Sequence, residues 1–161
     1  MILAHDVYSE TNPAYCTYVL GTFISSFISV KPEGPEVVAA YLAIPLALSG
    51  ELEPSFLGTN KNTGLIEWLE RSPIVQIGLT ARLNGSFDIV TEAVRLACFS
   101  DTVVLNSQAR LQLGSRKLKQ SARQGLSEPS RNALKRAERL GYWFGAAGSS
   151  RVIFEAMGLT V

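Results

Sequence analysis

The stretch that decides the fold is SEPSRNALKRAERLGYWFGAAG, residues 127–148. Its apolar side chains recur at three- and four-residue spacing, which places them on one face of a helix: Ala133, Leu134, Ala137, Leu140, Trp143 and Phe144. Ser127-Glu128-Pro129 is typical of a helix start, and Gly148 ends the pattern. A glycine inside a helix costs about 0.8–1 kcal/mol relative to alanine. The four-residue spacing of Gly141 and Gly145 therefore predicts a second helix packed closely against this one.

The chain before this stretch also favours helices. Asn12 can cap a helix whose first position is Pro13, and the next helix should kink or end at Pro45. We predict helices over residues 12–30, 35–49, 64–71, 73–84 and 87–100, with a loop at 50–63, an interruption at Gly85-Ser86 and a last short helix over 152–157.

A change of pattern marks one β-hairpin. Thr102-Val103-Val104-Leu105 is β-branched, Asn106-Ser107 can turn, and Arg110-Leu111-Gln112-Leu113 alternates. We therefore expect a predominantly helical α+β fold: one compact domain of about five to seven helices with a short hairpin. Its parts are an irregular leader (1–11), a helical body (12–100), the hairpin (102–113), a basic loop (114–127) and C-terminal helices (128–161). Helices followed by a hairpin also allow a winged-helix arrangement.

Residues 11–30 carry no charge over the length of a membrane-spanning helix. The run contains several hydroxyl side chains, and Thr17, Gly21, Ser25 and Ser29 form a stripe of small residues on one helix face. Such a stripe lets another helix approach closely. We expect a buried or partner-facing helix here, with a membrane helix as the alternative.

Charge is distributed unevenly along the 161 residues, although the formal net charge is only +1. Residues 1–106 hold five basic and eleven acidic side chains, whereas residues 107–140 hold nine basic and two acidic ones. These nine form what we call the basic strip: Arg110, Arg116, Lys117, Lys119, Arg123, Arg131, Lys135, Arg136 and Arg139. Lys and Arg bind DNA phosphates by releasing counterions. The strip is therefore a candidate surface for DNA or for an acidic partner, or a solvated face. Charged residues make up only 18% of the chain, which hints that part of the surface is covered by another molecule.

The residues that catalysis needs are scarce. His5 is the lone histidine and precedes the predicted helices, Cys16 and Cys98 are far apart, and the three aspartates are scattered. A nucleophile needs a neighbouring base, and a zinc site needs about four ligands. No glycine pattern matches a phosphate-binding loop. We therefore predict no enzyme activity, no metal and no cofactor, with the cysteines reduced in a cytoplasmic protein.

Four segments together resemble a known family. They are TNPAYC (residues 11–16), YLAIPLAL (41–48), AERLGYWFGAAG (137–148) and IFEAMGL (153–159). The chain resembles the small middle component of three-component ABC systems, in which an SMC- or Rad50-like ATPase works with an effector, often a nuclease, in bacterial antiphage defence of the Lamassu type. The residues that carry the resemblance have structural roles by pattern: Asn12, Pro13, Pro45, Gly141, Trp143, Phe144 and Gly145.

The resemblance implies a non-catalytic bridge between the ATPase, the effector and double-stranded DNA. On this hypothesis the apolar N-terminal half faces partners, and the basic strip faces DNA or an acidic surface of the ATPase. A second hypothesis is a stand-alone winged-helix regulator that binds DNA as a symmetric dimer. A third is a small membrane-associated protein built on the helix at 11–30.

Overall fold

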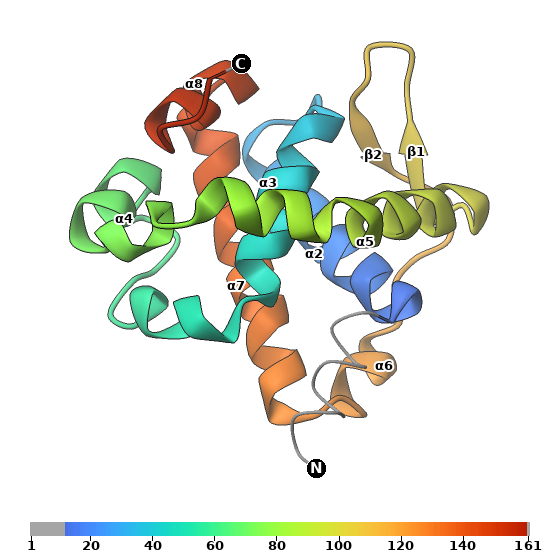
Figure 1. The fold of residues 1–161 in the computed structure, drawn as a ribbon. Coiled ribbons are helices and arrows are strands. Elements are labelled where there is room, and N and C mark those ends of the chain that lie inside the picture. Colours follow the sequence, from blue (N-terminus) through green and yellow to red (C-terminus); the bar gives the residue numbers. More distant parts are fainter. Residues whose placement is uncertain (1–11, 161) are drawn as a thin grey trace.

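The computed structural model describes residues 12–160, so the predicted leader and His5 lie outside the described residues. These residues form seven α-helices, two 3-10 helices and one two-stranded hairpin (Figure 1). The α-helices are α2 (Pro13–Val30), α3 (Val37–Leu48), α4 (Leu65–Arg71), α5 (Leu79–Phe99), α6 (Gln120–Gln124), α7 (Glu128–Ala147) and α8 (Ser150–Ala156). The 3-10 helices are η1 (Gly50–Phe56) and η2 (Pro73–Gln76), and the strands are β1 (Val103–Leu105) and β2 (Leu111–Leu113). The expected helical domain with one hairpin is confirmed.

The centre of the fold is the pair formed by α2 and α7. The Tyr15 hydroxyl donates to the Ser130 carbonyl at 2.9 Å near the start of both helices. Further along, Gly141 lies against Ser26, and Gly145 lies against Val30. In each of these contacts the residue of α7 lies 115 positions after its partner in α2. Because this separation does not change along the pair, the two helices run parallel. The close packing predicted from Gly141 and Gly145 is confirmed.

Both helices of this pair begin as the sequence predicts. The Asn12 side chain accepts hydrogen bonds from the amides of Ala14 and Tyr15 and so caps α2, with Pro13 in the first turn. The Ser127 hydroxyl accepts from the Ser130 amide and caps α7. These bonds satisfy amides that a helix start otherwise leaves without partners.

Helix α3 packs against α2, α5 and α7, and Figure 1 shows that α5 passes across α3 and α7. Every residue of α3 from Ala39 to Ala47 except Tyr41 is buried. Pro45 lies inside α3, and the helix continues for three further residues to Leu48 before the chain turns sharply into η1.

An aromatic cluster joins α7 to the loop region before α4. The Phe56 and Trp143 rings stack with centroids 5.8 Å apart, and Trp68 lies 5.1 Å from Trp143. Both indole nitrogens donate hydrogen bonds: Trp68 to the Ser55 hydroxyl at 3.2 Å and Trp143 to the Asn60 carbonyl at 3.0 Å. Buried indoles need such acceptors, so the cluster fixes the course of residues 55–60.

Two predicted loops contain helical turns. Residues 50–63 begin with η1, because Leu52 and Phe56 are buried four residues apart and draw this segment onto the core. The predicted basic loop at 114–127 contains α6, whose five residues include no buried side chain.

The predicted helix over residues 73–84 and the break at Gly85-Ser86 are wrong. Pro73 starts only a 3-10 turn, which ends at Gln76 with Ile77 in an extended conformation, and Gly78 with a left-handed φ of 66° precedes α5. A continuous 21-residue α5 follows and passes through Gly85. Its buried residues before and after the glycine, Leu79 and Val90, lie on the core side, so tertiary packing outweighs the glycine's low helix propensity.

One described helix, Pro13–Val30, is long and apolar enough to cross a membrane, and the bent pair of α3 and η1 passes the same test when taken as one span. However, 56% of Pro13–Val30 is buried inside the fold, as in a core helix. The apolar N-terminal helices form the core: Val30 and Val38 are the large apolar residues exposed within residues 12–56. Most apolar side chains of α2 and α3 therefore face the core, whereas Leu57, Ile66 and Ile77, later in the N-terminal half, are exposed.

Candidate functional site

Four arginines of the basic strip donate hydrogen bonds to backbone carbonyls within the domain. Arg136 is only 6% exposed; its Nε donates to the Ala47 carbonyl at 2.8 Å, and its guanidinium lies 3.6 Å from Glu53. Arg139 donates to the Phe56 carbonyl and the Thr59 hydroxyl. These bonds anchor the segment 47–59 on α7; Arg136 is withdrawn from the surface, and Arg139 remains half-buried.

The other two arginines of this group stabilise the turns before α3 and before α7. Arg110 donates to the Gly34 carbonyl at 2.7 Å and lies 4.0 Å from Glu36, which ties the hairpin to the turn before α3. Arg131 donates to the Leu126 carbonyl at 3.2 Å, just before the start of α7.

Four other cations of the strip are exposed and make no side-chain hydrogen bond or ion pair with any residue in the described range: Arg116, Lys117, Lys119 and Lys135. The ninth, Arg123, lies 4.0 Å from Glu138, and both side chains are partly exposed. The structure thus divides the predicted strip, so that fewer than half of its cations remain unpaired at the surface.

Two of these exposed cations, together with Arg123, line a groove of about 480 Å³. Its floor is the outer face of α2, which presents Gly21, Thr22, Ser25 and Ser29, and its opposite wall is the segment 113–123. Arg116, Lys117 and Arg123 supply the positive charge, Glu138 supplies the negative charge, and Leu113 and Leu118 add apolar surface. We call this hollow the α2 groove.

The stripe of small residues meets another helix, as predicted, only at its start. Thr17 there is buried, and its hydroxyl lies 2.8 Å from the Pro13 carbonyl and 3.3 Å from the Ala93 carbonyl of α5. Gly21 lies under Leu118, since a Cβ atom there would be 2.6 Å from the Leu118 Cδ1 atom. Ser25 and Ser29 are exposed in the α2 groove. Helix α7 packs instead on the adjacent face of α2.

The wall of the α2 groove has few attachments to α2. Leu118 packs over Gly21, and the Tyr18 hydroxyl donates to the Lys119 carbonyl at 3.0 Å. At the start of this wall, the Ser115 hydroxyl donates to the Asp101 carboxylate, and the Arg116 amide donates to the Asp101 carbonyl at 3.0 Å. The wall is thus fixed at one end, held on α2 by Leu118 and Tyr18, and held on α7 by the pair of Arg123 and Glu138.

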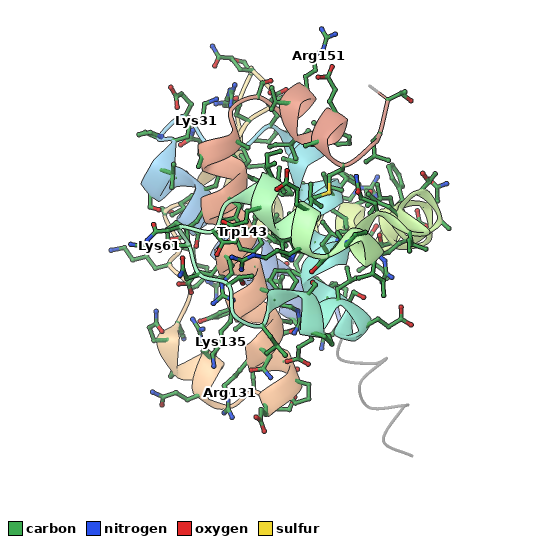
Figure 2. All side chains as sticks on the ribbon, turned by 90° about the vertical axis from the view of Figure 1, so that its left-hand side faces the viewer. Lys31, Lys61, Arg131, Lys135, Trp143 and Arg151 are labelled. Carbon is green, nitrogen blue, oxygen red and sulfur yellow. The ribbon has the colours of Figure 1, made fainter. Side chains whose placement is uncertain are left out.

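A second hollow lies on the other side of Glu138 and Tyr142. It measures about 360 Å³ and is lined by Asn60, Lys61, Lys135, Glu138, Arg139 and Tyr142. Figure 2 shows that Lys31, Lys61, Lys135 and Arg131 all lie on this side of the molecule, around α7. The Lys61 ammonium is 5.8 Å from the centre of the Tyr142 ring, at the outer limit of a cation–π contact.

The hairpin lacks the features of a DNA-contacting wing. Its connecting residues, 106–109, are uncharged, and the nearby Arg110 is bound to Gly34. Its partly exposed side chains are Val104, Leu105 and Leu113, while Val103 and Leu111 are buried. The neighbouring Phe99 at the end of α5 is 91% exposed.

The residues quoted for the family resemblance are structural in this fold. Trp143 and Phe144 are fully buried, as is Pro45, and Gly141 and Gly145 allow α7 to approach α2. Within residues 12–160 there is no group of three or more His, Cys, Asp or Glu residues that could hold a metal ion.

The structure thus has a helical domain with a divided basic surface and a groove of mixed polar and apolar lining. The chain matches the ABC-three component (ABC-3C) system Middle Component 3 family over residues 2–161, and it belongs to that family. No curated protein and no solved structure matches the chain.

Proposed function

We propose that this middle component is a non-catalytic bridging subunit, which links an SMC- or Rad50-like ATPase to an effector in bacterial defence against phage or plasmid DNA. The observation that carries the proposal is membership of the Middle Component 3 family over nearly the whole chain. The Lamassu type and a cytoplasmic location belong to the same proposal.

The surface supports a role in assembly. Several large apolar side chains are strongly exposed, and they include Leu57 after η1, Ile77 before α5 and Phe99 at the end of α5. Apolar side chains of this exposure are covered favourably when a partner binds. The exposed cations Arg116, Lys117, Lys119 and Lys135 can in addition contact an acidic partner or DNA.

The proposal is tested by purifying the tagged chain from cells that carry its native gene neighbourhood, with nuclease added to the lysate. We expect a large coiled-coil ATPase to co-purify in a stable ratio, and the tag alone to recover none. Recovery of the chain alone as a discrete homodimer would contradict the proposal and favour the winged-helix regulator.

A further inference from the structure

We propose that the α2 groove binds an acidic, partly apolar peptide segment of a partner protein in the same assembly. This inference rests on the proposed function and deepens it, because it assigns one surface of the bridge and the chemistry of its occupant.

Charge gives the first argument. The groove lining contains three cations, Arg116, Lys117 and Arg123, and one carboxylate, Glu138. Arg116 and Lys117 have no internal ion pair in the described residues, so a carboxylate from a partner need not displace an existing contact. Opposite charges across an interface steer binding and set its register.

Two hydroxyl groups on the floor give the second argument, because they favour a peptide N–H over a phosphate; the exposed Ser25 hydroxyl can donate or accept and does not discriminate between the two. The Thr22 hydroxyl already donates to the Tyr18 carbonyl at 2.9 Å, and the Ser29 hydroxyl donates to the Ser26 carbonyl at 2.6 Å. Because each of these two hydroxyl protons is already donated to a backbone carbonyl, the Thr22 and Ser29 oxygens can only accept a hydrogen bond from a bound molecule. Phosphate oxygens also accept and gain nothing from them, whereas a peptide N–H can donate to them.

Size and polarity give the third argument. Affinity for DNA grows with the number of phosphates that are neutralised, about six to ten in a strong binder, and the lining of this groove holds three cations. Its volume of about 480 Å³ lies within the range of about 300–1,000 Å³ that accepts small ligands, so it accommodates a short segment. Leu113 and Leu118 in the lining offer nothing to a phosphate backbone, but they can contact apolar side chains that alternate with the acidic ones.

The test places a photoreactive benzoylphenylalanine at Ser25, which is exposed on the groove floor, in the full chain co-expressed with its neighbouring genes. The control places it at Thr80, which is exposed on α5 outside the groove lining. We expect the Ser25 position to form an adduct with a partner subunit, mapped by mass spectrometry to an acidic segment with apolar residues, and the Thr80 position not to form that adduct.

Charge variants then test the chemistry. The double variant Arg116→Glu/Lys117→Glu should lower the adduct yield by about tenfold or more, because two attractions become repulsions. The matched variant Lys135→Glu, on the other side of Glu138, should leave the yield within about twofold. Glu138→Gln should raise the yield by about two- to threefold, because it removes the carboxylate beside Arg123. Unchanged melting temperatures show that all of these variants fold.

Each other outcome contradicts the inference. An adduct with DNA, with a second copy of this chain or with a non-acidic segment overturns it. The same holds if Ser25 forms no adduct although the ATPase co-purifies, and in that case the proposed function still stands. If the ATPase does not co-purify, the proposed function and this inference fail together.

Discussion

Gly141 on α7 lies directly against Phe23 on α2, so closely that a Cβ atom at residue 141 would be 2.5 Å from the Phe23 carbonyl oxygen and 2.6 Å from the Ser26 Cβ atom. This contact sets the separation of the two central helices. The neighbouring position, Gly145, is less crowded, since a Cβ atom there would be 3.0 Å from the Val30 Cβ atom.

Gly141→Ala is therefore expected to destabilise the protein, although alanine is the better helix former. Overpacking against backbone costs about 1–3 kcal/mol, and the gain in helix propensity offsets up to about 1 kcal/mol. We expect a net loss of about 1–2 kcal/mol in the free energy of unfolding, measured by urea denaturation. Gly85→Ala on α5 is the matched control, because nothing lies within 4 Å of its Cβ position. That substitution should stabilise the protein by about 0.5–1 kcal/mol, and equal stability of the two variants would contradict the packing argument.

Arg136→Ala should destabilise the fold, whereas Lys135→Ala should not, although the two residues are adjacent cations of the same helix. Arg136 is buried against the Ala47 carbonyl and Glu53, and its removal leaves a buried acceptor without its donor. We expect a loss of about 2–3 kcal/mol for Arg136→Ala. For Lys135→Ala, which is exposed, we expect a change within about 0.5 kcal/mol. Thermal unfolding of both variants distinguishes them, and similar melting temperatures would show that Arg136 is not an anchor.

Trp143→Phe should lower the free energy of unfolding by about 2 kcal/mol, because it removes the hydrogen bond to the Asn60 carbonyl and leaves space beside Phe56. Tyr142→Phe at the adjacent, half-buried position is the control and should cost less than about 0.5 kcal/mol. Urea titration followed by tryptophan fluorescence gives the values for both variants, with Trp68 as the remaining tryptophan in Trp143→Phe. A cost no greater than that of the control would contradict the role assigned to this indole.

Leu118→Ala should loosen the wall of the α2 groove without unfolding the domain. Leu118 covers Gly21, and α6 in the same segment has no buried side chain. Local opening of such segments requires little free energy. We expect faster amide hydrogen exchange, by about tenfold, within residues 114–124 and unchanged exchange in α7. Ser121→Ala, at an exposed position on α6, should leave both rates unchanged. Equal exchange in Leu118→Ala and the unaltered chain would show that the wall is held by other contacts.

The sequence predicted those parts of the fold that depend on local signals. The caps at Asn12 and Ser127, the apolar spacing of α7 and the alternation in the hairpin all act within a few residues. The same local reasoning failed at Gly85, since the packing of Leu79 and Val90 decides that α5 continues through it. It also left residues 50–56 as loop, because their helical turns form where Leu52 and Phe56 meet distant residues of the core.

The candidate site was only partly predictable. Sequence order places nine cations in one strip, but it does not show that Arg136 reaches Ala47 or that Arg139 reaches Phe56, both more than 80 positions away. The stripe of small residues was visible, yet the sequence did not indicate that Leu118 would cover Gly21 and leave Ser25 in a groove.

The amino-acid sequence by itself determined the helical class, the glycine-mediated approach of α7 to a second helix and the concentration of positive charge after residue 106, because periodicity, glycine spacing and charge are properties of the chain. Only the tertiary structure decided which helix Gly141 meets, which cations become anchors and which remain at the surface. The physical reason is that an arginine such as Arg136 becomes an anchor when it is buried with a carbonyl that accepts its hydrogen bond, and the position of that carbonyl is set by the packing of the whole domain.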